Sequence, residues 1–98
     1  MNFNEKCYEI LKKVPRGKVT TYKEIALALK SKGYRAVGNA MNKNPYAPHV
    51  PCHRVVGSDG KMVGFADGVN KKIKMLRGEG VEVVDDKVDL DKYFYGLK

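Results

Sequence analysis

The densest cluster of reactive side chains in this 98-residue sequence is Pro51-Cys52-His53-Arg54. A free thiol titrates at about 8.5, so little of it is nucleophilic thiolate at neutral pH. Neighbours such as His53 and Arg54 favour the thiolate, and Cys–His pairs activate nucleophiles in many unrelated enzymes. Neighbours in an extended strand point to opposite faces, so this pair can cooperate only if the chain turns here. A structural cysteine beside a surface histidine fits the same residues.

Other residues add candidates for this chemistry. Glu79 stands between two glycines and is either a solvated surface acid or the third group that orients His53. His49, Cys52, His53 and Cys7 lack the paired spacing of zinc ligands, so we expect no metal site.

The charge of the chain is strongly basic. Nineteen Lys and Arg oppose 11 Asp and Glu, a formal net charge of +8. This excess favours polyanionic partners, nucleic acid before anionic membrane, although solubility alone would also explain it. Hydrophobic residues make up 43% of the chain, which suits a soluble globular domain, and we find no signal-peptide pattern or membrane-spanning run. Two cysteines are too few for a disulfide-stapled secreted domain, so we expect a reducing, intracellular setting.

The amino-terminal half carries three helical signals. Apolar residues at helical spacing predict a helix over residues 4–14, with Cys7 on its buried face as an inert thiol. Thr21, followed three residues later by Glu24, predicts a capped helix start. A further helix is expected over residues 34–42, with Val37 and Met41 inward, and the pair suggests a helix-turn-helix.

The helix at 34–42 has an unusual number of small residues: Ala36, Gly38, Asn39 and Ala40. Small side chains permit close approach of something bulky. That partner is either another helix of the same chain or the sugar-phosphate walls of a DNA groove.

The carboxyl-terminal half alternates short elements with turns. Three prolines exclude a helix over residues 44–51, and an Asp-Gly turn predicts a hairpin over residues 55–63. A loop follows at 64–68, and then a helix at 69–76 with three outward lysines, Lys71, Lys72 and Lys74. We expect a short hairpin at 81–88 and a last helical turn capped by Asp89.

Residues 44–57 resemble the active-site segment of the O6-alkylguanine-DNA alkyltransferases, also called methylated-DNA–protein-cysteine methyltransferases. The similarity continues in order along the chain: residues 14–22 resemble the entry to that family's helix-turn-helix, 34–41 its recognition helix, 64–66 its pocket loop and 77–80 the end of its closing helix. The resemblance implies a mainly α fold with a short β element, a small winged-helix-like domain. We expect one domain over residues 1–98, with a family-like core at about 3–82 and a tail at 83–98.

The resemblance also implies a function, which is DNA repair by direct reversal. A thiolate takes the alkyl group from guanine O6 after base flipping, in a single turnover that needs no cofactor. Cys52 corresponds to the acceptor, His53 to the base that acts through a water, and Glu79 to the carboxylate that orients it. Asn44 corresponds to the amide that braces the turn, and Tyr22 to the phenol that helps rotate the nucleotide and assists the leaving guanine.

Two further groups of residues follow from the same resemblance. The expected DNA-binding residues are Arg35, which fills the base stack, with Tyr22, Ala36, Gly38 and Asn39. The expected substrate pocket consists of Pro51, Val55, Phe65, Ala66 and Met41. The implied partner is double-stranded DNA carrying O6-alkylguanine, with no membrane; we expect a monomer located in the cytoplasm, with access to chromosomal DNA.

The sequence departs from the family pattern in three places. The separate amino-terminal domain found in many members is absent from these 98 residues. Asp67 stands where glycine is common at the pocket lip, so we expect poorer acceptance of bulky adducts such as benzyl. Ala66 lacks a hydroxyl that some members carry.

Two other functions compete with alkyl transfer. Alkyltransferase-like proteins share the fold and bind lesions without transfer, but they replace the acceptor thiol, usually by tryptophan; Cys52 is present here and the chain has no Trp. A thiol-sensing helix-turn-helix regulator would need a dimer interface and polar base-reading residues, and the helix at 34–42 offers few of the latter.

Overall fold

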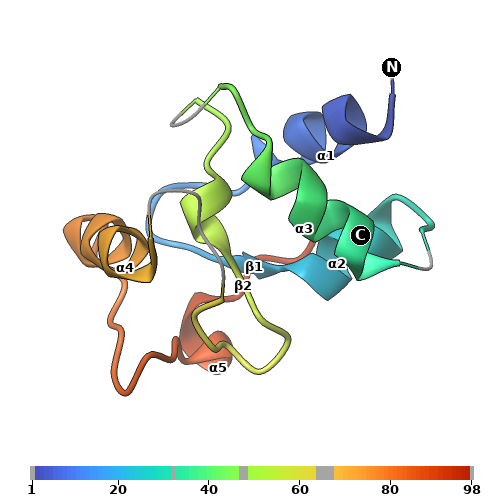
Figure 1. The fold of residues 1–98 in the computed structure, drawn as a ribbon. Helices are drawn as coiled ribbons and strands as arrows, with labels where there is room; N and C mark the ends of the chain where they lie inside the picture. The colour runs from blue at the N-terminus through green and yellow to red at the C-terminus, as the bar shows by residue number, and fades with distance from the viewer. Residues whose placement is uncertain (1, 32, 47–48, 64–67, 98) are drawn as a thin grey trace.

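The computed structural model describes residues 2–31, 33–46, 49–63 and 68–97 (Figure 1). Helices form most of the regular structure, and the sheet is small, which confirms the expected fold class. The elements in order are α1 (Phe3–Leu11), β1 (Thr20–Thr21), α2 (Tyr22–Ala28), α3 (Tyr34–Asn42), the 3-10 helix η1 (Cys52–Arg54), β2 (Val55–Val56), α4 (Val69–Gly78) and α5 (Leu90–Tyr93).

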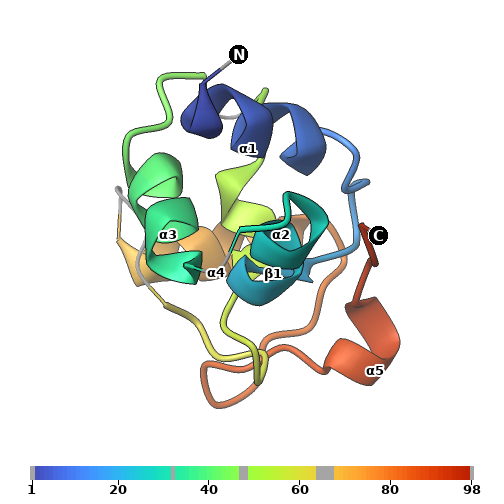
Figure 2. The same ribbon diagram turned by 90° about the vertical axis from the view of Figure 1, so that its right-hand side faces the viewer.

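The helices α1, α2 and α3 pack together around one apolar cluster, and Figure 2 looks onto them. The Thr21 hydroxyl accepts a hydrogen bond from the Glu24 backbone N–H at 3.0 Å, which confirms the predicted start of α2. The Glu24 carboxylate does not complete the capping box; it accepts instead from the backbone N–H of Leu97 at 2.7 Å. The bounds of α3 are as predicted, with Val37 and Met41 buried.

The predicted hairpin over residues 55–63 is wrong in its pairing. The turn forms, because the Gly57 backbone N–H donates to the Lys61 carbonyl at 2.9 Å. However, β2 pairs in parallel with β1, and Lys61 bridges to Lys87. Val55 and Val56 are both fully buried, and a strand covered on both faces is typical of parallel pairing inside a fold.

The carboxyl-terminal segment closes the second apolar cluster, in which Val83, Val88 and Tyr93 pack with residues of β2 and α4. The predicted hairpin at 81–88 forms as a tight turn with one antiparallel bridge, between Val84 and Lys87. The two aspartates between them have positive φ. Asp89 caps α5 as predicted. The chain then runs beside β1, where the Tyr95 backbone N–H donates to the Val19 carbonyl at 2.7 Å.

The expected helix at 69–76 is α4, which continues to Gly78. One expectation for its faces is wrong, because Lys72 is fully buried instead of facing out. The predicted loop at 64–68 lies outside the described residues except for Gly68. Along the described ranges, no helix has the length and apolar character needed to cross a bilayer.

Candidate active site

The chain turns at the reactive cluster, as cooperation between Cys52 and His53 requires. Residues Cys52–Arg54 form the single 3-10 turn η1, closed by a hydrogen bond from the Arg54 backbone N–H to the Pro51 carbonyl at 2.9 Å. Successive side chains in such a helix project about 120° apart, so they neither align nor oppose one another. This turn contacts α4, and Figure 1 shows it between α3 and α4.

Asn44 holds the approach to this turn. Its side-chain Nδ2 donates to the Val50 carbonyl at 2.9 Å, and its Oδ1 accepts from the Tyr46 backbone N–H at 2.9 Å. The amide therefore ties the end of α3 to the residues just before Cys52.

His53 and Arg54 both reach Glu79, which lies directly after the last residue of α4. His53 Nε2 lies 3.0 Å from Glu79 Oε2. Arg54 donates through Nε to Oε1 at 2.9 Å and through Nη2 to Oε2 at 2.7 Å. Gly80 adopts a positive φ of 88°, which turns the chain away after Glu79 and leaves the carboxylate directed at η1.

These contacts fix the protonation state of the pair. Burial alone would raise the pKa of Glu79, but hydrogen bonds from Arg54 and His53 outweigh it and lower that pKa to about 2. An ionised carboxylate can only accept hydrogen bonds, so His53 Nε2 carries the proton and Nδ1 of the neutral ring is the acceptor. Burial lowers the pKa of His53, aided by Arg54 and Lys72 against the opposing effect of Glu79.

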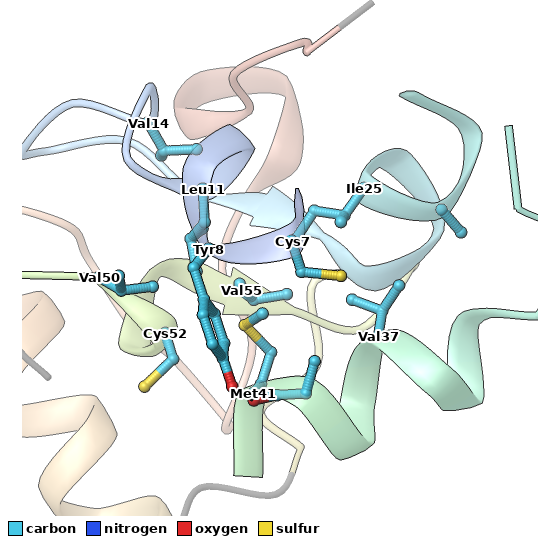
Figure 3. Packing of buried hydrophobic residues seen from close by; sticks show 12 residues of the cluster. Cys7, Tyr8, Leu11, Val14, Ile25, Val37, Met41, Val50, Cys52 and Val55 are labelled. Atoms are coloured by element: carbon cyan, nitrogen blue, oxygen red, sulfur yellow. Dashed lines mark hydrogen bonds between the residues drawn. The ribbon is translucent and has the colours of Figure 1, made fainter. Parts of the chain in front are cut away.

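The two cysteines differ in environment, as the sequence predicts. Cys7 is fully buried in the first cluster, and burial raises the pKa of its thiol to about 11. Cys52 lies at the edge of that cluster with 7% of its surface exposed. Figure 3 shows the sulfur of Cys7 inside the group of labelled side chains and the sulfur of Cys52 directed away from it.

Tyr22 and Lys72 complete the polar surroundings of the thiol. The Lys72 Nζ donates to the Val63 carbonyl at 2.9 Å and lies 5.7 Å from the centroid of the Tyr22 ring. Burial lowers the pKa of Lys72 to about 8, with Cys52 acting in the opposite direction. Burial, together with Cys52, raises the pKa of Tyr22 to about 12, so its phenol stays protonated at neutral pH.

Two features of the site were not predicted from the sequence: the burial of Lys72, and the pairing with Glu79 of Arg54, which was named only as a neighbour of the thiol. Lys72 lies three residues after Val69 and four before Leu76, which is the spacing of the apolar face of α4. That spacing was the available signal. No comparable signal exists for Arg54, because its partner Glu79 is 25 residues away.

Replacement of Lys72 by methionine is expected to raise the free energy of unfolding at neutral pH, because it removes a buried cation. In the folded chain the pKa of Lys72 is about 8, whereas the ordinary pKa of a lysine, which applies to the unfolded chain, is 10.5. The unfolded state binds more protons between these values, so wild-type stability rises with pH there and the advantage of Lys72→Met shrinks. Urea denaturation at a series of pH values in this range measures the difference in free energy of unfolding between Lys72→Met and wild type. A difference that does not change with pH would contradict the lowered pKa of Lys72. Lys74→Met, at an exposed position of α4, is the matched control.

Most of the small residues of α3 lie at the surface of the molecule. Arg35, Ala36 and Asn39 are exposed, and a Cβ added to Gly38 would meet no atom of the described residues within 4 Å. Ala40 alone among them is fully buried, where its carbonyl accepts from the Tyr8 hydroxyl at 2.8 Å. Packing against another helix of this chain therefore does not explain Ala36 or Gly38, which favours an external partner.

A groove of about 700 Å³ lies beside this surface. Its lining includes Tyr22, Tyr34, Gly38, residues 57–59, Lys61 and Val63. Of the expected pocket residues, Pro51, Val55 and Met41 are buried, the last two in the cluster that contains Cys52. Phe65 and Ala66 lie outside the described residues. Among the described residues, no three His, Cys, Asp or Glu side chains gather as a metal site would require.

Comparison with known proteins bears on the family. The family model described as "6-O-methylguanine DNA methyltransferase, DNA binding domain" matches residues 2–81. The methylated-DNA–protein-cysteine methyltransferase of Methanosarcina barkeri is 47% identical over 79 residues, which cover 80% of this chain and 50% of that protein. The chain thus spans about half the length of this relative.

Solved structures agree with the sequence comparison. The O6-methylguanine-DNA methyltransferase of Pyrococcus kodakaraensis strain KOD1 matches with a TM-score of 0.76 and 48% identity, over 83% of this chain and 47% of that one. S. pombe Atl1, in complex with damaged DNA containing O6-carboxymethylguanine, matches with a TM-score of 0.86 and 34% identity, over 95% of this chain and 94% of that one. The chain therefore belongs to the family of 6-O-methylguanine DNA methyltransferase DNA-binding domains.

Proposed function

We propose that this chain repairs O6-alkylguanine in DNA by irreversible transfer of the alkyl group to Cys52. The observation that carries the proposal is the arrangement at η1. A thiol at the edge of the core precedes a histidine whose Nε2 is held 3.0 Å from the ionised carboxylate of Glu79. That arrangement leaves Nδ1 of His53 as a base, which is what a thiol nucleophile needs.

The proposed reaction begins with a proton transfer. The Cys52 thiol gives its proton, through a water molecule, to His53 Nδ1. The thiolate then attacks the alkyl carbon, an S–C bond forms, and the C–O6 bond breaks with its electron pair passing to guanine. The protonated phenol of Tyr22 donates a hydrogen bond to the departing guanine anion. The proton that His53 received from the thiol passes through water to this anion, which leaves guanine and the imidazole neutral. The resulting thioether is a stable bond that water does not cleave, so each molecule acts once.

The target carbon lies inside the duplex, so the nucleotide must be flipped out, at a cost of a few kcal/mol. The exposed small residues of α3 let that helix approach the DNA closely, and the net charge of +8 provides attraction to phosphates. In this proposal Arg35, exposed at the start of α3, fills the space that the flipped base leaves.

Arg35→Ala is expected to weaken base flipping more than binding to undamaged duplex, because the stack closes when nothing fills the gap. Flipping is measured by the fluorescence of 2-aminopurine at the target position, and binding by titration of both duplexes. Lys43→Ala, which removes an exposed cation from the other end of α3, should weaken both readouts alike. If Arg35→Ala weakened base flipping and binding to undamaged duplex equally, Arg35 would not be the residue that fills the base stack.

The single-turnover character is tested by stoichiometry. The chain is incubated with excess duplex carrying isotopically labelled O6-methylguanine, and the label bound to protein is counted over time. We expect uptake to stop at one methyl per chain. Continued turnover, or label that never leaves the DNA, would overturn the proposal.

A second function, lesion binding without transfer, is favoured by one observation. The match to Atl1 covers nearly the whole of both chains, and that structure holds DNA containing O6-carboxymethylguanine. In the labelling experiment this alternative predicts tight binding to the lesion with no label on the protein.

A further inference from the structure

We propose that Arg54 is a positioning residue for alkyl transfer: its guanidinium balances the charge of Glu79, so that the carboxylate orients His53 without holding a second proton on the ring. This inference rests on the proposed function, in which His53 must be neutral before it accepts the thiol proton.

The first support is the geometry of the ion pair. Arg54 and Glu79 form a two-pronged contact through Nε and Nη2, at 2.9 and 2.7 Å. Oε2 of Glu79 is shared, because the same atom lies 3.0 Å from His53 Nε2. The remaining guanidinium nitrogen, Nη1, donates to the Val14 carbonyl at 2.9 Å, which fixes the plane of the fork.

The second support is that water cannot provide the same balance of charge. The side chains of His53, Glu79 and Arg54 have only 3%, 10% and 16% of their surfaces exposed. Interactions between charges are strong in such surroundings and weakly screened by salt. A carboxylate that contacted only His53 here would stabilise the imidazolium and remove the base.

The third support is the inventory of charges around the ring. Among the residues that the structure describes, the charged groups that act on His53 are the Glu79 carboxylate, the Arg54 guanidinium and the Lys72 ammonium. Two cations therefore face one anion. Removal of the Arg54 charge would leave one of each, and the shared oxygen would interact with His53 alone.

The decisive experiment follows the titration of His53 by NMR in the free protein, which requires no alkyl transfer. Arg54→Gln and Arg54→Met remove the positive charge. Arg54→Lys keeps the charge but loses the paired hydrogen bonds from Nε and Nη2 to Glu79. We expect His53 to titrate at higher pH in the two neutral variants and at its wild-type pH in Arg54→Lys. His49, the other histidine, is exposed and serves as an internal reference whose signal should not move between variants.

Several outcomes would overturn the inference. His53 could titrate at unchanged or lower pH in a folded neutral variant, or could move equally in Arg54→Lys. Unfolding of both neutral variants while Arg54→Lys folds would assign Arg54 a structural role instead.

The consequence for the reaction is a change in its pH profile. On the acid side of the profile, methyl transfer by Arg54→Gln should be slower than wild type by roughly threefold or more. The difference in rate should narrow as rising pH removes the proton from His53 of the variant. A loss that is uniform with pH would also contradict the inference. If wild type itself takes up no methyl, the proposed function fails, and the NMR titration still decides the role of Arg54.

Discussion

Replacement of Cys52 by alanine is expected to abolish methyl transfer completely while leaving affinity for lesion-bearing duplex within about threefold of wild type. The sulfur is the only atom of the proposed machinery that forms a covalent bond, so nothing else in the chain can substitute for it. Most groups assigned to DNA binding lie on α3. Tyr22, at the start of α2, borders the thiol and keeps its phenol in the variant. Transfer is measured by label uptake and affinity by titration of duplexes with and without O6-methylguanine.

Cys7→Ala is the matched control, because it removes the other thiol of the chain. Cys7 is fully buried in the core, so the variant should lose stability, by about 1–2 kcal/mol, and still take up methyl when folded. Methylation of the Cys52→Ala protein, or loss of transfer only in Cys7→Ala, would show that the acceptor has been misassigned.

Gly60→Ala is expected to have the largest effect on stability, with a loss of about 3–5 kcal/mol in the free energy of unfolding. Gly60 has a positive φ of 88°, which L-residues with a side chain rarely adopt. A Cβ at this position would also run into the Val88 carbonyl, which is backbone and cannot move aside alone. The Val88 backbone N–H donates to the Gly60 carbonyl at 2.9 Å, so the clash separates the turn after β2 from the carboxyl-terminal segment.

Gly78→Ala provides the control, because Gly78 is a helical residue of α4 and a Cβ there would meet none of the described atoms within 4 Å. That variant should be as stable as wild type or slightly more so, because alanine favours the helix. Chemical denaturation of both variants gives the comparison. A Gly60→Ala protein with wild-type stability would mean that the chain does not make this contact between the turn and Val88.

Elements specified by neighbouring residues were predictable from the sequence. Thr21 and Asp89 cap helices where their side-chain oxygens reach backbone N–H groups two or three residues on. The bounds of α3 followed from apolar spacing in the same way. These interactions are local, so a short window of sequence contains all the information they need.

Features that depend on distant residues were predicted less well. The Asp-Gly turn at 58–60 forms, but the partner of β2 is β1, and nothing in residues 55–63 indicates that choice. Arg54 shows the same limit in the site, because its pairing with Glu79 exists only once α4 has packed against η1. The burial of Lys72 was readable from the apolar face of α4, but a general preference of lysine for solvent argued against it.

The most direct test of the central claim locates the transferred carbon on the protein. The wild-type chain is incubated with duplex carrying O6-methylguanine, digested, and its peptides are weighed by mass spectrometry. The account predicts a gain of one methyl group on the peptide that contains Cys52, with the Cys7 peptide unchanged and guanine restored in the DNA. Lesion-bound protein whose Cys52 peptide keeps its original mass would contradict the account.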